Sequence, residues 1–216
     1  AAVAAAFHRQ PGFRVVIPDY RLFQDVVFPA FMEDAAAAVA WALNNESNSS
    51  AEDAGLYLVG HSAGAHIAVL LATDHQYLET QSVPSDAIFG LVGLSGPYDF
   101  LPLESGYLQD VFPADRREKS QPINFITASM PPTLLVHGED DDVVEPGNTA
   151  RFAAAARDAG VSVTVKYYED TGHAAVAAAM APQLEFVADT LSDTIMFINE
   201  QEALRASRDG QKNPES

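Results

Sequence analysis

A serine between two glycines offers the clearest chemistry in this sequence. The segment Gly60-His61-Ser62-Ala63-Gly64 follows an apolar run and precedes a stretch with helical spacing. A turn from strand to helix strains the serine backbone, and the start of the helix aims its free N–H groups at the charge that develops beside the serine. Such groups stabilise the negative charge that develops when a hydroxyl attacks a carbonyl. We therefore predict that Ser62 is a nucleophile and that the Ala63 N–H is an oxyanion donor.

The same pattern also arises by chance, in which case the serine only caps a helix. A strand before the serine and a helix after it favour the nucleophile. The turn also requires small neighbours, so we expect both Gly60 and Gly64 to allow the helix start to pack against the strand.

A serine nucleophile needs a base, and His173 has the best position for it. It lies in the segment EDTGH, just after the last apolar run, at the carboxyl end of a predicted strand. His137 precedes a glycine at the end of another strand, which is typical of a packed structural residue. His61 and His66 flank the serine; His61 is a candidate wall of the substrate pocket, and His66 lies one helical turn further on.

The base in turn needs an orienting acid, for which the sequence offers several candidates. The segment LLVHGEDDDVV supplies Asp140, Asp141 and Asp142 at the end of a predicted strand, and Asp99 follows the strand before it. A shift of one residue in the loop changes which carboxylate faces the histidine. Spacing alone therefore leaves the choice open.

These residues require a scaffold of strands alternating with helices. Continuous Val, Ile and Leu runs indicate strands covered on both faces, and helical stretches lie between them. We predict one doubly wound, mostly parallel α/β domain over residues 1–203 and a flexible tail over residues 204–216. The predicted strands are 13–18, 56–60, 87–95, 132–138 and 161–168, and the main predicted helices are 28–45, 63–78, 148–160 and 182–204.

Composition narrows the classes of partner. The net charge of -18 opposes binding to phosphate backbones, so nucleic acid is not expected. The chain has no cysteine, which excludes disulfides and thiolate metal sites. No apolar run is long enough for a membrane span, and the first residues do not resemble a secretory leader, although one could have been removed. The compartment therefore stays undecided, with a soluble, cytoplasmic protein favoured. No metal or organic cofactor is implied.

Longer segments of the chain resemble the α/β-hydrolase superfamily of serine esterases. They are most similar to the carboxylesterase-like branch that includes kynurenine formamidase and isoprenylcysteine methylesterase relatives. The segments that carry the resemblance are VVIPDYRL (15–22), FPAFMEDAAAAVAW (28–41), VGHSAGAHIAVLLA (59–72), GLSGPYDF (93–100), PPTLLVHGEDDDVV (131–144) and TGH (171–173).

The resemblance implies a triad and a substrate class. In the family pattern H-G-x-x-D-x-x-V the acid is the fifth residue, which is Asp141 here. Ser62, Asp141 and His173 would then hydrolyse a small-molecule ester through an acyl-enzyme. Tyr98 and Phe100 are candidate pocket walls, with core packing as the alternative. Amide hydrolysis of the aryl-formamidase type remains an alternative that these residues do not exclude.

The chain departs from the family at its beginning. Relatives carry an H-G-G-G or similar loop whose N–H groups complete the oxyanion hole, and this sequence lacks it. The resemblance therefore implies an N-terminally short hydrolase, and it favours a piece of a longer protein over a shortened relative whose oxyanion hole is completed differently. A bare sheet edge would be covered by the missing strands or by a partner, such as a second copy in a homo-oligomer. A non-catalytic scaffold of hydrolase fold is the remaining alternative.

Overall fold

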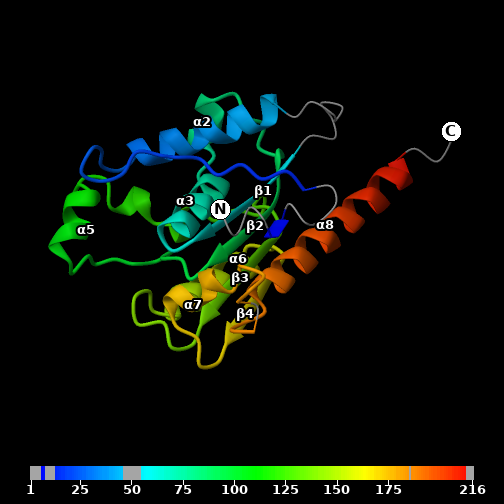
Figure 1. The fold of residues 1–216 in the computed structure, drawn as a ribbon. Coiled ribbons are helices and arrows are strands. Elements are labelled where there is room, and N and C mark those ends of the chain that lie inside the picture. Colours follow the sequence, from blue (N-terminus) through cyan, green and yellow to red (C-terminus); the bar gives the residue numbers. More distant parts are fainter. Residues whose placement is uncertain (1–5, 8–12, 46–54, 185, 213–216) are drawn as a thin grey trace.

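A sheet of four parallel strands forms the centre of the molecule (Figure 1). The computed structural model describes residues 6–7, 13–45, 55–184 and 186–212. The strands follow one another across the sheet in chain order. Because all of them are parallel, their four carboxyl ends lie at the same end of the sheet. They are β1 (Leu56–His61), β2 (Ile88–Leu94), β3 (Thr133–Gly138) and β4 (Val163–Tyr168).

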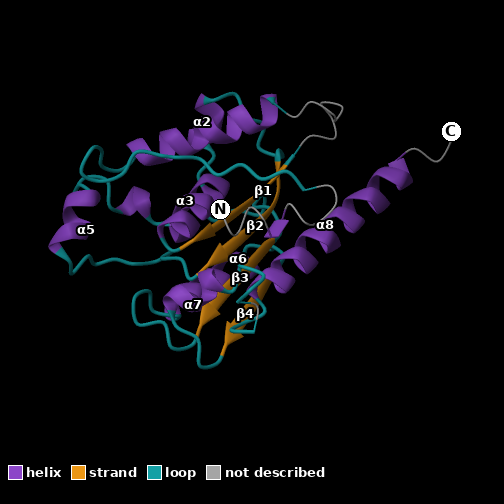
Figure 2. Ribbon diagram, viewed as in Figure 1, coloured by secondary structure: helices purple, strands orange, loops and turns teal. Residues whose placement is uncertain are grey.

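Helices cover both faces of this sheet (Figure 2). The α-helices are α2 (Ala30–Asn44), α3 (Ala63–Thr73), α4 (Gln76–Thr80), α5 (Gly106–Val111), α6 (Gly147–Asp158), α7 (His173–Ala178) and α8 (Thr190–Lys212). Two short 3-10 helices, η1 (Glu118–Ser120) and η2 (Pro122–Phe125), lie between α5 and β3. No helix in the described ranges is both long enough and apolar enough to cross a membrane.

The alternation of side chains along the strands explains the two covered faces. Leu91 and Leu135 pack with Phe152 of α6 and with the buried face of α3. The next residue on one strand, Val92, and the preceding one on the other, Leu134, belong to a second cluster with α7 and α8. The two central strands, β2 and β3, are buried on both faces and are accordingly the most apolar, whereas β4 at the edge carries Thr164 and Lys166. The predicted doubly wound α/β fold is thus confirmed, and four of the five predicted strands are present.

The predicted strand over residues 13–18 is wrong. These residues are extended but belong to no sheet, and Val15, Val16 and Ile17 are 39%, 47% and 60% exposed. Within the described residues, β1 pairs only with β2, and its other edge has no strand beside it. A β-branched sequence becomes a strand only where a neighbour can pair with it, and the segment has none here.

The last helix also differs from its predicted bounds. It begins at Thr190 rather than residue 182, because the preceding residues form tight turns such as that from the Leu184 N–H to the Ala181 carbonyl. It continues to Lys212, so residues 204–212 of the predicted tail are helical, and residues 213–216 lie outside the described range. Arg205 lies over the ring of Phe89, 3.2 Å from its centroid, which ties this part of α8 to the domain.

Candidate active site

The turn after β1 has the strained geometry that the sequence predicts. Ser62 has φ 55° and ψ -120° and directly precedes α3. A Cβ at Gly60 would collide with the backbone carbonyl of Gly64, so glycine is obligatory at position 60. A Cβ at Gly64 would meet nothing within 4 Å, so close packing does not require the second glycine. The expectation that both glycines allow the packing is therefore correct for Gly60 alone.

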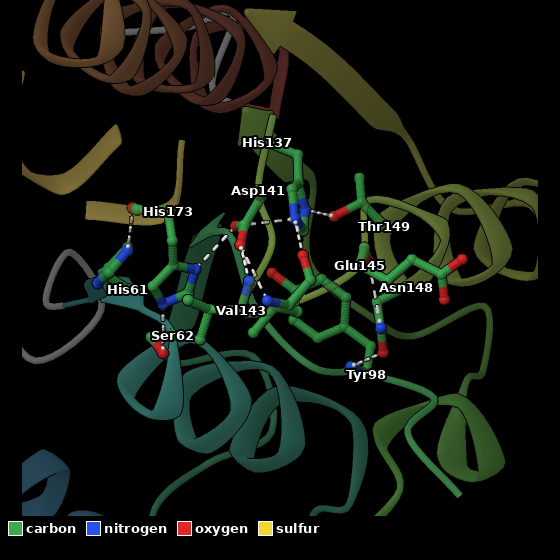
Figure 3. A network of polar contacts seen from close by, with 11 residues as sticks. His61, Ser62, Tyr98, His137, Asp141, Val143, Glu145, Asn148, Thr149 and His173 are labelled. Atoms are coloured by element: carbon green, nitrogen blue, oxygen red, sulfur yellow. Dashed lines mark hydrogen bonds and ion pairs between the residues drawn. The ribbon is translucent and has the colours of Figure 1, made fainter. Parts of the chain in front are cut away.

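His173 follows β4, at the opposite edge of the sheet from β1, yet its side chain lies next to Ser62. His173 is the first residue of α7, and its Nε2 lies 2.9 Å from the Ser62 Oγ (Figure 3). The two residues are separated by 111 positions in the chain. This distance and orientation allow the imidazole to accept the serine proton.

The other ring nitrogen of His173 identifies one aspartate among the candidates. Its Nδ1 lies 2.7 Å from the Asp141 Oδ2. The Oδ1 of the same carboxylate accepts hydrogen bonds from the N–H groups of Val143, at 3.0 Å, and Val144, at 2.9 Å. Burial by itself raises the pKa of Asp141, but the bonds from Val144, His173 and Val143 outweigh it, so the net pKa is lowered. The carboxylate is therefore ionised at neutral pH.

The other acidic candidates point elsewhere. Asp140 and Asp142 are exposed, whereas the Asp141 side chain is buried. Asp99 forms an ion pair with Arg151, whose Nη2 also donates to the Asp99 carbonyl at 2.9 Å. Of the four aspartates that the sequence offers, only Asp141 contacts His173.

His61 contacts His173 directly. Its Nε2 lies 3.0 Å from the His173 carbonyl oxygen, and the two rings are 4.6 Å apart between centroids. The carbonyl can only accept, so Nε2 of His61 carries the proton and donates it. Burial lowers the pKa of His61 against the opposing effect of this bond. A neutral His61 therefore holds the backbone of His173 in place.

The two aromatic residues that are predicted to form pocket walls differ in burial. Tyr98 is fully buried and packs against Phe152, with 5.0 Å between ring centroids, so it belongs to the core rather than to a pocket wall. Its backbone N–H donates to the Asn148 Oδ1 at 3.1 Å. Phe100 is only partly buried and packs edge-on against His66 at 5.4 Å.

His66 and His137 are both buried, but they differ in relation to the site. His66 bonds to the Ser120 carbonyl at 2.7 Å, and burial lowers its pKa to about 4. His137 was predicted to be a structural residue, yet its Nε2 lies 3.2 Å from the Asp141 Oδ2. The signal available in the sequence was the four-residue spacing between His137 and Asp141 across a strand end.

Known proteins match both the sequence and the fold. The BD-FAE family profile matches residues 2–155. Esterase LipQ of Mycobacterium tuberculosis is 26% identical over 204 residues, which cover 87% of this chain and 48% of that protein. A probable isoprenylcysteine α-carbonyl methylesterase of Arabidopsis thaliana is 26% identical over 72% of this chain and 37% of its own length. The chain thus spans less than half of these relatives.

Solved structures support the same fold at lower identity. A truncated carbohydrate esterase from gut microbiota superposes with a TM-score of 0.72 at 19% identity, covering 94% of this chain and 79% of that one. A putative carboxylesterase from Lactobacillus plantarum gives 0.73 at 16% identity, covering 93% and 78%. The resemblance to α/β-hydrolase esterases is thereby confirmed, and the chain belongs to the BD-FAE family of this superfamily.

Proposed function

We propose that this chain hydrolyses carboxylic esters of small or medium size through an acyl-enzyme on Ser62. The observation that carries the proposal is the continuous hydrogen-bonded line from the Ser62 Oγ through His173 to Asp141. A buried carboxylate with lowered pKa on Nδ1 fixes the tautomer in which Nε2 can accept a proton. The names of the matched relatives, which include esterases, favour an ester over an amide substrate.

In the first half-reaction the Ser62 Oγ attacks the ester carbonyl while His173 Nε2 takes the hydroxyl proton. The tetrahedral oxyanion lies at the start of α3, where the Ala63 N–H has no acceptor within its own helix and can donate to it. Collapse of this intermediate breaks the bond to the alcohol, which leaves with the proton from His173. Water then attacks the acyl-Ser62 ester, His173 again moving the proton, and the carboxylic acid departs.

The test is labelling with a fluorophosphonate probe, read by intact mass, beside hydrolysis of p-nitrophenyl acetate and p-nitrophenyl octanoate. We expect one adduct on the wild type, and loss of both the adduct and turnover in Ser62→Ala. Ser82→Ala is the matched control, since Ser82 also has positive φ (57°) but is exposed in a turn. It should label and turn over as the wild type does.

The same assay separates the alternatives. An N-formyl aryl amide hydrolysed faster than either ester would replace the ester proposal by an amide one. A folded wild-type chain that neither labels nor turns over any of these substrates would overturn the proposal and favour a non-catalytic scaffold. Labelling that persists in Ser62→Ala would assign the nucleophile to another residue.

A further inference from the structure

A buried histidine, His137, extends the chain of polar contacts from Ser62 and His173 beyond Asp141. His137 lies at the carboxyl end of β3, and its side chain is fully buried. Its Nε2 lies 2.9 Å from the Val144 carbonyl and 3.2 Å from the Asp141 Oδ2. Its Nδ1 lies 2.7 Å from the hydroxyl of Thr149, on α6, which is also fully buried. Figure 3 shows this line running from Thr149 to Ser62.

The partners of His137 determine where its protons lie. Both groups at Nε2 are acceptors, a backbone carbonyl and an ionised carboxylate, so Nε2 carries the hydrogen. Burial lowers the pKa of His137 and keeps the ring neutral, so Nδ1 is an acceptor and the Thr149 hydroxyl donates to it. The two acceptors at Nε2 thus set the tautomer of His137, and the bond from Thr149 to Nδ1 holds the orientation of the ring.

We propose that His137, oriented by Thr149, is a positioning residue for the acid of the triad. Its Nε2–H donates to the same carboxylate oxygen that accepts from His173. It also holds the Val144 carbonyl, in the residue whose N–H donates to the other oxygen. One imidazole therefore fixes both oxygens of Asp141, one directly and one through the backbone.

This arrangement explains why a strand so apolar ends in a histidine. The Asp141 carboxylate has no exposed surface, so its charge must be satisfied by donors inside the protein. The side-chain donors are His137 and His173, and the backbone donors are the N–H groups of Val143 and Val144. Without His137 the oxygen facing His173 would keep only one donor, and the carboxylate would be free to rotate away from the base.

The proposal rests on the proposed function, and Thr149→Val tests it with minimal change of shape. Thr149→Ser keeps the hydroxyl, and Thr194→Val is the matched control, because Thr194 is equally buried but lies on α8 with its hydroxyl bonded to the Thr190 carbonyl. We expect Thr149→Val to lower kcat roughly tenfold with KM unchanged, in the range for residues that orient a catalytic ligand. Thr149→Ser should stay within about twofold, and Thr194→Val should leave kcat unchanged.

A second readout does not depend on turnover. The proton between His173 and Asp141 should give a low-field ¹H resonance, assigned by its absence in Asp141→Asn. We expect Thr149→Val to shift or broaden it, and Thr149→Ser and Thr194→Val to preserve it. His137→Leu should also shift or broaden this resonance, because the Asp141 oxygen that faces His173 loses its second donor.

The outcomes separate the two proposals. The wild type could lack esterase turnover but still show the resonance, and Thr149→Val could lose it. That result would refute the proposed function and support the positioning role. A Thr149→Val variant with wild-type kcat and an unmoved resonance would overturn the positioning role alone. An equal loss of kcat in Thr194→Val would also overturn it, since the effect would then come from weakened packing.

Discussion

Exchange of the buried aspartate for its amide gives the sharpest test of the triad. In Asp141→Asn the two N–H groups of Val143 and Val144 still require an acceptor at the Oδ1 position. The amide oxygen therefore takes that place and the NH₂ group faces Nδ1 of His173, 2.7 Å away. A donor there forces the ring proton onto Nε2, which then meets the Ser62 hydroxyl with a hydrogen instead of a lone pair.

The expected loss is large because the variant traps the wrong tautomer. The same exchange in a Ser-His-Asp protease lowers kcat about 10⁴-fold, or roughly 5.5 kcal/mol of transition-state stabilisation. A second conflict adds to it: the NH₂ group would face the Nε2–H of His137, which lies 3.2 Å from the same oxygen position. We expect kcat for p-nitrophenyl acetate to fall about 10³–10⁴-fold.

The neighbouring aspartates provide matched controls. Asp140→Asn and Asp142→Asn remove the same charge one position to either side, on exposed side chains. Each should keep kcat within about twofold, since a screened surface charge contributes little. Thermal unfolding of all three variants identifies any loss that comes from misfolding. The reasoning is refuted if folded Asp141→Asn retains a tenth or more of the activity, or if a neighbouring variant loses as much.

Three further predictions follow from the elements around the site. Gly60→Ala should destabilise the fold by about 2 kcal/mol or more in urea unfolding, because its Cβ would strike the Gly64 carbonyl, whereas Gly64→Ala faces open space and should be neutral. The pKa of about 4 for buried His66 means that the unfolded chain binds more protons between about pH 4 and 6.5; stability should fall by about 2 kcal/mol from pH 7.5 to 5, and His66→Gln should flatten that slope. Asp99→Asn breaks only a half-exposed pair with Arg151, so kcat should stay within about twofold; a hundredfold loss would contradict the choice of acid.

The sequence predicted the four strands of the sheet well, both the buried central pair and the two edge strands. The runs at 56–60, 87–95, 132–138 and 161–168 became β1 to β4 with ends shifted by at most two residues. Residues 13–18 carry the same β-branched character but form no strand, because the neighbour that would pair with them is not among the described residues. Local composition records a tendency, and hydrogen-bonding partners decide the outcome.

In the candidate site, too, the sequence predicted the local features and missed those that depend on distant contacts. The turn at Ser62 depends on local backbone geometry, so its own residues predicted it. The choice of Asp141 came from a family pattern, since three adjacent aspartates are equivalent by type and only the path of the loop distinguishes them. Tyr98 follows a strand as a pocket residue would, but its ring is fully buried in the core, and its N–H donates to Asn148. No local signal carries that contact, which spans 50 positions.

The position of His173 depends on a loop that must travel back across the sheet. It follows β4, whereas Ser62 follows β1, and three strand spacings of about 4.8 Å separate these strands. Residues 169–173 therefore cross the end of β3, where the Thr171 carbonyl accepts from the Asp140 N–H at 3.1 Å. A Cβ at Gly138 would collide with that same carbonyl. Gly138 thus leaves room for the segment that leads to His173, while His137 contacts Asp141. In H-G-x-x-D one dipeptide therefore contacts both of the elements that position the proposed partners of Ser62.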